Sequence, residues 1–222
     1  MRLAKDPQKD YKAIVEQGYD ACSAAYDEAR QNANAPELDL LIPRLAVGAQ
    51  VLDIGCGAGV PVAQRLVKQF KVTGVDISAE QVKRAKDNVP QGTFMQMDIM
   101  ATDFPSASFD AIVAFYSIFH LPREEHAALL RKIKDWLKPG GYLLATLSSD
   151  PESAYTEEDF FGVKMYWSNL ELGKYHALLK EMGFELLDAS VIGHGFGKGA
   201  PAADESHPLV FARKSDGQWG DH

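Results

Sequence analysis

The residues best suited to chemistry gather in one glycine-rich segment, VLDIGCGAGVP at residues 51–61. Gly55, Gly57 and Gly59 directly follow a short apolar run and precede apolar residues at helical spacing. Glycines at these places let the chain turn tightly, and they let a ligand approach bare backbone at a helix N-terminus. The segment therefore predicts a ligand-binding loop between a strand and a helix.

The residues around these glycines indicate the kind of ligand. A dinucleotide fingerprint requires glycine at position 60, where this chain has Val60. Asp53, at the end of the predicted strand, repels a pyrophosphate and attracts an ammonium group. The loop favours an amino-acid-like ligand. A nicotinamide-dependent oxidoreductase shares the strand, the glycine loop and a distal acid, and it stays open as an alternative.

Two further aspartates end predicted strands. Asp76 lies 23 residues after Asp53, where a carboxylate accepts hydrogen bonds from both hydroxyls of a ribose. Asp98 follows the next predicted strand, at the same sheet edge and within reach of an adenine amino group. The alternative for both residues is an ordinary strand end or a helix cap.

Short apolar runs alternate with amphipathic stretches from residue 51 onward, as is typical of βαβ architecture. Ser78 and Gln81 form a capping-box signature, which predicts that a helix begins there. The predicted fold is α/β, a doubly wound, mostly parallel seven-stranded sheet with an antiparallel edge hairpin. The predicted strands are 51–54, 71–76, 93–97, 109–115, 142–147, 184–192 and 209–212, and the predicted helices are 62–70, 78–90, 122–138 and 170–182.

Length and composition predict one globular domain. The chain has 222 residues, of which 46% are apolar and 24% are charged. Its net charge of −8 disfavours a nucleic-acid partner, and no apolar run is long enough to span a membrane. Two cysteines and a polar N-terminus predict a cytoplasmic protein, either a monomer or a homodimer. We expect a domain at 1–214, with a helical cap at 1–46 and a substrate-side segment at 149–169, and a flexible tail at 215–222.

Five motifs in order resemble the class I, Rossmann-like, S-adenosylmethionine-dependent methyltransferase family. They are DIGCGAG at 53–59, GVDIS at 74–78, MDI at 97–99, FD at 109–110 leading to HL at 120–121, and LKPGG at 137–141. The resemblance covers roughly residues 45–150. It implies S-adenosylmethionine as cofactor, with S-adenosylhomocysteine as its product, and methyl transfer to a small-molecule acceptor. A non-catalytic module that binds S-adenosylmethionine is a further alternative.

The resemblance also implies roles for individual residues. The three glycines pass beneath the methionine part, Asp53 faces its amino group, and Asp76 holds the ribose. The remaining implied cofactor contacts are Ile77 and Ile99 against adenine, Asp98 at its N6, Phe115 and Ser117 near the sulfonium, and Tyr19 and Tyr26 as a cover. No metal site is expected.

A general base is needed only if the acceptor carries a proton of high pKa. His120, after the fourth predicted strand, is the best-placed candidate; His194 and His207 flank the glycine-rich connector at 193–208. The alternative for His120 is a helix-entry residue bonded to backbone. The aromatic and acidic residues of 149–169 predict either a wall for a neutral or cationic substrate or a surface loop packed on the core.

Overall fold

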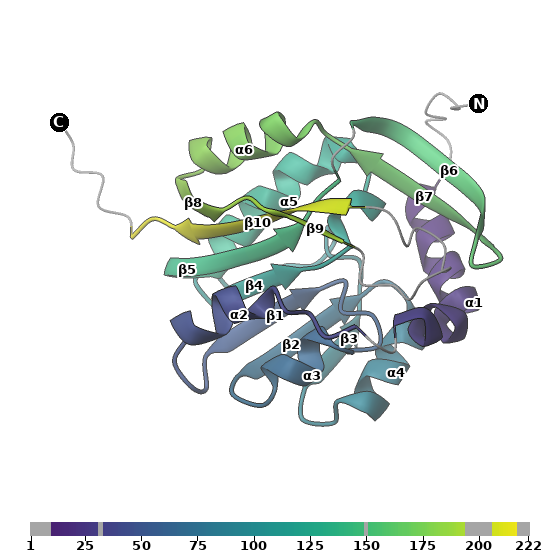
Figure 1. Ribbon diagram of the computed structural model, residues 1–222, viewed down its shortest axis with the longest axis horizontal. Coiled ribbons are helices and arrows are strands. Elements are labelled where there is room, and N and C mark those ends of the chain that lie inside the picture. The colour runs from purple at the N-terminus through teal and green to yellow at the C-terminus, as the bar shows by residue number, and fades with distance from the viewer. Residues whose placement is uncertain (1–9, 31–32, 149–150, 194–205, 217–222) are drawn as a thin grey trace.

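The computed structural model describes residues 10–30, 33–148, 151–193 and 206–216. Helices and strands alternate through most of this chain (Figure 1). The helices are α1 (Tyr11–Arg30), α2 (Leu38–Leu41), α3 (Val62–Leu66), α4 (Ala79–Asn88), α5 (Arg123–Trp136) and α6 (Leu172–Glu181), with 3₁₀ turns η1 (Ile42–Arg44) and η2 (Ile118–His120). The strands are β1 (Gln50–Ile54), β2 (Lys71–Asp76), β3 (Thr93–Gln96), β4 (Phe109–Ala114), β5 (Leu137–Thr146), β6 (Glu152–Phe160), β7 (Val163–Asn169), β8 (Phe184–Asp188), β9 (Val191–Gly193) and β10 (Ser206–Lys214).

A mostly parallel sheet forms the centre of the fold, in the order β3-β2-β1-β4-β5-β10-β8. β1 pairs in parallel with both β2 and β4, while β10 runs antiparallel to β5, β8 and β9. The predicted α/β fold with its antiparallel hairpin is confirmed. The described part of the sheet has eight strands rather than the predicted seven, because the strand predicted at 184–192 is divided into β8 and β9, which both pair with β10. The strand order reverses between β1 and β4, and ligands of such sheets bind outside the carboxyl ends of the strands at that point.

Two hydrophobic layers cover the sheet because alternate strand residues point to opposite faces. Leu52 and Ile54 of β1 pack in one layer with α5 and α6. Val51, the residue before Leu52, packs in the other layer with α2, α3 and α4. The sheet is therefore doubly wound, as predicted. Among the described residues, no helix combines the length and the apolar character needed to cross a membrane.

Several predicted boundaries differ from the structure. The helix predicted at 62–70 ends at Leu66. Beyond it, the N–H groups of Lys68 and Gln69 donate to carbonyls only three residues back, so the regular α-helical pattern is interrupted. β5 begins at Leu137 rather than at 142, because Leu137 pairs with Phe109 ahead of a register shift. The capping-box prediction is correct for the start of α4, since Ser78 Oγ accepts a hydrogen bond from the Gln81 backbone N–H at 3.1 Å.

Residues 152–169 of the predicted substrate-side segment form a hairpin instead of a loop. β6 and β7 pair antiparallel, and Phe161 and Gly162 make the turn with φ values of +52° and +81°. α1 lies beside this hairpin, and Tyr11 and Val15 of α1 share a small core with Tyr166 of β7 (Figure 1). The N-terminal helix and the hairpin thus form one unit at an end of the sheet.

Candidate functional site

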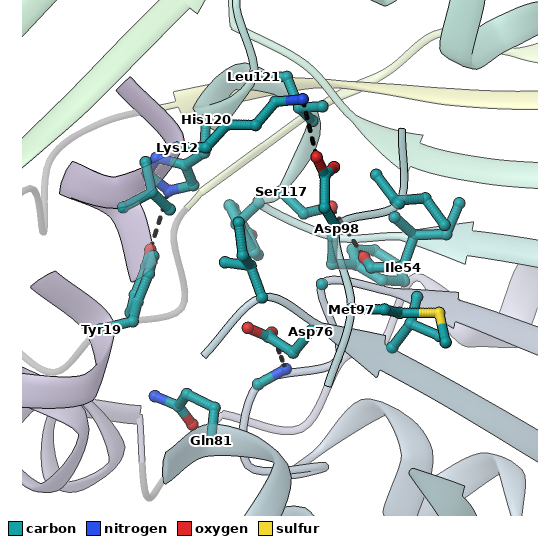
Figure 2. A pocket seen from close by; sticks show the side chains of 18 of the residues that line it. Lys12, Tyr19, Ile54, Asp76, Gln81, Met97, Asp98, Ser117, His120 and Leu121 are labelled. Carbon is teal, nitrogen blue, oxygen red and sulfur yellow. Dashed lines mark hydrogen bonds and ion pairs between the residues drawn. The ribbon is translucent and has the colours of Figure 1, made fainter. Parts of the chain in front are cut away.

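Two neighbouring cavities lie at the carboxyl ends of the central strands. The strand-end cavity has a volume of about 110 Å³ and is shown in Figure 2. The glycine-loop cavity has a volume of about 450 Å³ and extends along the β1–α3 loop. Residues common to both are Tyr26, Gly55, Gly57, Phe115 and Tyr116. The reversal of strand order and the cavities coincide, as the general rule for such sheets predicts.

The glycines of the β1–α3 loop occupy positions where a side chain would overlap a neighbour or strain the backbone. Gly55 has φ +68°, and a Cβ there would overlap the Cβ of Ser117, whose hydroxyl donates to the Ile54 carbonyl at 2.8 Å. Gly57 has φ +52° and donates its N–H to Asp76 at 2.8 Å. Gly59 lines neither cavity; a Cβ there would lie 3.0 Å from Val89, so this glycine allows the loop to pack on α4.

Asp53 is a buried acid without a counterion in the described chain. Its residue is only 2% exposed, and its Oδ2 has no hydrogen-bond partner among the described residues. Burial, with a smaller contribution from the charge of Asp76, raises the pKa of Asp53 to about 7. The residue lines the glycine-loop cavity, so a bound cation there would stabilise its charged form.

Asp76 is held by backbone. Its two carboxylate oxygens accept the N–H groups of Gly57 and Ser78 at 2.8 and 2.9 Å, which fixes the side chain at the strand-end cavity. Burial raises its pKa, and these hydrogen bonds offset part of that rise. Ile77 lines the cavity next to it. Each oxygen keeps further lone-pair capacity for a ligand.

Asp98 forms a hydrogen bond and an ion pair that the sequence did not predict. Its carboxylate accepts the Met100 N–H at 2.8 Å and pairs with Lys12 of α1 at 3.0 Å (Figure 2). Lys12 also pairs with Glu125 at 2.9 Å. Asp98 and Ile99 both line the strand-end cavity, but the ion pair means that a ligand amino group would share Asp98 with Lys12.

Tyr19 and His120 form a hydrogen-bonded pair on the wall of the strand-end cavity (Figure 2). His120 Nδ1 lies 2.8 Å from the Tyr166 carbonyl oxygen, which only accepts, so Nδ1 carries a hydrogen. In the neutral ring Nε2 then accepts, and the Tyr19 hydroxyl, 2.9 Å away, donates to it. Burial raises the pKa of Tyr19 well above its usual value, which keeps this donor protonated.

Aromatic rings from α1 and from the hairpin surround this pair. Tyr19 meets Tyr26 edge-on at 5.3 Å and Phe160 at 6.3 Å, measured between ring centroids. Trp167 of β7 lies 5.7 Å from the His120 ring, and Phe161 lies 5.7 Å from Tyr26. The aromatic rings of the hairpin therefore pack against those of α1.

Of the other two candidate histidines, the structure describes only His207, and His207 does not join the site. His207 is buried in β10 and lines neither cavity; its Nδ1 donates to the Leu147 carbonyl at 2.9 Å, and its ring stacks on Phe119. His194 lies outside the described residues.

Sequence reasoning did not assign several residues that line the cavities, among them four with polar or charged side chains. Lys12 and Gln81 line the strand-end cavity, Arg30 lines the glycine-loop cavity, and Tyr116 lines both. Tyr116 has φ +53°, its N–H donates to the Thr146 hydroxyl at 2.6 Å, and the Arg30 guanidinium lies over its ring at 4.9 Å. Only Gln81 gave a signal, as the fourth residue of the capping box.

Comparison with known proteins identifies the family. Residues 51–141 match a family model described as a methyltransferase domain. The chain is 34% identical over 153 residues to 27-O-demethylrifamycin SV methyltransferase of Amycolatopsis mediterranei, which is 64% of this chain and 56% of that protein. It is 30% identical over 148 residues to aklanonic acid methyltransferase of a Streptomyces species, 61% of this chain and 66% of that protein. The chain thus spans between about half and two thirds of these relatives.

Solved structures share the fold. A 1,6-didemethyltoxoflavin-N1-methyltransferase of Burkholderia thailandensis, with bound S-adenosylhomocysteine, aligns with a TM-score of 0.71 at 21% identity, covering 96% of this chain and 94% of that one. Magnesium protoporphyrin IX methyltransferase of Synechocystis, with bound S-adenosylmethionine, aligns at 0.70 and 17% identity, covering 95% and 100%. The chain belongs to the class I, Rossmann-like, S-adenosylmethionine-dependent methyltransferase family.

Proposed function

We propose that this chain transfers the methyl group of S-adenosylmethionine to a small-molecule acceptor. The observation that carries the proposal is the buried carboxylate of Asp53, which stands beside the bare backbone of Gly55 and Gly57 at the point where the strand order reverses. A nicotinamide dinucleotide would bring a pyrophosphate to this acid. A sulfonium amino acid brings an ammonium group instead.

The residues present fit this cofactor. The ammonium group of its methionine part would supply the partner that Asp53 Oδ2 lacks among the described residues. Because Gly55 carries no side chain, the backbone there stays open to a ligand. Asp76 retains acceptor capacity for ribose hydroxyls. The other proposed contacts are Gly57 and Gly59 in the loop, Ile77, Ile99 and Asp98 around adenine, Phe115 and Ser117 near the sulfonium, and Tyr19 and Tyr26 as cover.

The bound cofactor supplies an electrophilic methyl group. The task of the protein is to align an acceptor with that methyl and to exclude water. The rings of Tyr26, Phe160 and Trp167 suit both purposes, because a wall of this kind binds a planar apolar molecule and lowers the local dielectric constant. The neutral sulfur formed by methyl loss is also favoured in such surroundings.

His120 is the proposed proton acceptor, acting through Tyr19. An acceptor hydroxyl gives its proton to the Tyr19 oxygen while the Tyr19 proton passes to His120 Nε2, a distance of 2.9 Å. The resulting imidazolium keeps its Nδ1–H bond to the Tyr166 carbonyl. This arrangement suits acceptors with an ionisable hydroxyl. The name of the rifamycin relative, a 27-O-demethylrifamycin SV methyltransferase, indicates an oxygen acceptor for that protein, which supports an oxygen acceptor here.

The proposal is tested by incubating the protein with methyl-tritiated S-adenosylmethionine and a panel of phenols, hydroxyquinones, carboxylic acids, amines and thiols. We expect label in aromatic hydroxyl compounds, and we expect His120→Gln to reduce that transfer by about 100-fold or more. Cofactor binding with no transfer to any member of the panel would contradict the proposal and would favour the non-catalytic module.

We further propose that residues 1–214 act as a single methyltransferase domain in the cytoplasm, as a monomer or homodimer without a nucleic-acid partner. The free, buried thiols of Cys22 and Cys56 support a reducing compartment. The net charge of −8 supports the absence of a phosphate-backbone partner. Oxidised thiols in freshly isolated protein would contradict the first point, and salt-dependent DNA binding would contradict the second.

A further inference from the structure

A buried polar pair, His126 of α5 and Tyr175 of α6, lies in the apolar layer between these two helices. His126 Nδ1 lies 2.6 Å from the Tyr175 hydroxyl oxygen, and His126 Nε2 lies 3.0 Å from the Leu121 carbonyl oxygen. The Leu170 backbone N–H donates to the Tyr175 hydroxyl oxygen at 3.2 Å. Neither member of the polar pair lines the strand-end cavity or the glycine-loop cavity.

The direction of each hydrogen bond is fixed. A carbonyl oxygen only accepts, so His126 Nε2 carries a hydrogen and donates to Leu121. Nδ1 of the neutral ring then accepts from the Tyr175 hydroxyl. Burial lowers the pKa of His126 to about 4 and raises the pKa of Tyr175 to about 12, so both side chains are uncharged at neutral pH. The polar pair thus forms one continuous chain of hydrogen bonds from Leu170 to Leu121.

This chain joins the two segments that hold His120. Leu121 directly follows His120, and both line the strand-end cavity (Figure 2). Leu170 directly follows β7, and the Tyr166 carbonyl of β7 accepts the hydrogen of His120 Nδ1. The polar pair therefore ties the backbone next to His120 to the strand whose carbonyl fixes the His120 ring.

A second buried contact joins the same two segments. The N-cap residue of α5, Pro122, makes no side-chain hydrogen bond to the helix. The Arg123 backbone N–H instead donates to the hydroxyl oxygen of Ser168 in β7 at 3.0 Å. That hydroxyl donates in turn to the Ser153 carbonyl of β6 at 2.9 Å. The hairpin thus caps α5, and two sets of buried hydrogen bonds fix the separation of β7 from the start of this helix.

Simple packing does not require a polar pair at this place. Two apolar side chains would also fill the layer between α5 and α6, but they would leave the Leu121 carbonyl and the Leu170 N–H without these partners. Buried polar networks whose members are all bonded make the surrounding structure rigid. Rigidity matters for a catalytic group, because a displacement of about 1 Å can slow a reaction by about 100-fold.

We propose that the polar pair is a positioning device for His120: it keeps the ring in the tautomer that accepts a hydrogen bond from Tyr19. His126 and Tyr175 are thus positioning residues, which act through His120 and do not touch the cofactor or the acceptor. This inference rests on the proposed function, in which His120 receives the proton of the acceptor.

Nitrogen-15 NMR of the histidine-labelled full chain tests the inference without an acceptor, and His120→Gln assigns the signals of His120. We expect the wild type to carry a hydrogen on His120 Nδ1. In His126→Leu we expect a mixture of the two neutral tautomers, because the Tyr166 carbonyl is no longer held against the ring. His126→Gln should retain most of the wild-type signal, since an amide can donate to Leu121 and accept from Tyr175.

Methyl transfer from tritiated S-adenosylmethionine is the second readout, with the phenol that the wild type labels fastest as acceptor. His126→Leu should lower kcat by about 10–100-fold and should leave KM for S-adenosylmethionine within about twofold. In a His120→Gln background the same change should cause no further loss of kcat, because a residue that acts through His120 then has nothing to position. His126→Gln should restore kcat to within about threefold of the wild type.

Leu179→Ala is the matched control, since Leu179 of α6 is buried in the same layer and lines neither cavity. It should lower the melting temperature by about 5 °C or more and should leave both the His120 tautomer and kcat unchanged. If His126→Leu does not fold, Tyr175→Phe is measured in its place, because it removes the hydroxyl and keeps the ring.

An unchanged His120 tautomer in His126→Leu would overturn the inference. So would equal losses of kcat with and without His120, because a residue of purely structural importance would give that result. A wild type that methylates no compound of the panel, while the tautomer shifts as expected, would instead contradict the proposed function.

Discussion

The two sides of the site are built in different ways. The cofactor side consists of backbone turns and strand ends that are close in sequence, with Gly55 and Gly57 fixed by positive φ and Asp76 fixed by two backbone N–H groups. The acceptor side consists of side chains from α1, η2 and the β6–β7 hairpin, which are joined by ring contacts and one Tyr19–His120 hydrogen bond. Changes on the cofactor side should therefore affect folding and cofactor affinity, whereas changes on the acceptor side should affect transfer.

The largest expected effect comes from Asp53. Its pKa is about 7 in the folded protein and near its usual 3.8 in the unfolded chain, so the folded state holds an extra proton between these values. The contribution of Asp53 to the free energy of unfolding is fully present below about pH 4. As the pH rises from about 4 to about 7, the free energy of unfolding falls by about 4 kcal/mol. Urea unfolding of wild type and Asp53→Asn from pH 4 to 8 measures the difference.

Asp53→Asn should remove the fall in stability between about pH 4 and 7. It should also weaken S-adenosylhomocysteine binding at pH 8 by at least about tenfold, because the amide carries no charge to attract an ammonium group. Parallel stability curves for the two proteins would contradict the burial of an uncompensated acid. Equal affinities would contradict its proposed contact with the ligand.

Gly55→Ala is expected to destabilise the fold by about 3 kcal/mol. The alanine would adopt a left-handed backbone conformation and would also overlap Ser117. Gly162→Ala in the hairpin turn is the matched control, because Gly162 has φ +81° with no atom within 4 Å of the added Cβ. It should cost only the backbone contribution of about 1 kcal/mol. Equal losses in urea unfolding would mean that the cofactor loop is no more tightly packed than the hairpin.

Tyr19→Phe should slow methyl transfer to a hydroxyl acceptor by about 100-fold, or about 2.7 kcal/mol of barrier, because it removes the link to His120. Cofactor affinity should change by less than about threefold, since the ring remains. Tyr26→Phe, on the same helix, should retain transfer. Turnover is followed with labelled S-adenosylmethionine and affinity by calorimetry. A loss confined to cofactor affinity would assign Tyr19 to the cofactor side.

Lys12→Met is expected to have the smallest effect. Lys12 joins the two sides through ion pairs with Asp98 and Glu125, but these side chains are 25–34% exposed. Exposed ion pairs contribute less than about 1 kcal/mol and are screened by salt. Thermal melting should show a small loss at low salt that disappears at high salt. A large loss that persists at high salt would contradict this expectation, because exposed ion pairs are screened there.

The contrast also explains how much could be predicted from the sequence. The sheet, its hairpin of β8 and β10 and the loop after β1 were predictable, because buried strands and positive-φ turns restrict residue types strongly. Asp53, Asp76 and Asp98 were found because parallel strands bring their carboxyl ends to one edge. The glycines that turn the loop were found for the same local reasons, although Gly59 packs on α4 and lines neither cavity.

The acceptor side was not predictable in the same way. The β6–β7 turn uses Phe161 and Gly162 where hairpin signals have Asn-Gly, and its bulges interrupt the alternation of buried residues. The Tyr19–His120 bond joins residues 101 positions apart, and the Lys12–Asp98 pair joins residues 86 positions apart. Such contacts depend on how α1 packs against the hairpin, which no local pattern specifies.

Calorimetric titration of the wild type and Asp76→Ala with S-adenosylhomocysteine, with NAD as comparison ligand, tests whether the strand-end cavity is an adenosyl site. We predict one binding site per chain in the wild type, no detectable binding of NAD, and affinity weaker by about 100-fold in Asp76→Ala, because two hydrogen bonds to a charged group are lost. A wild type that binds NAD more tightly than S-adenosylhomocysteine, or an Asp76→Ala variant of unchanged affinity, would contradict this.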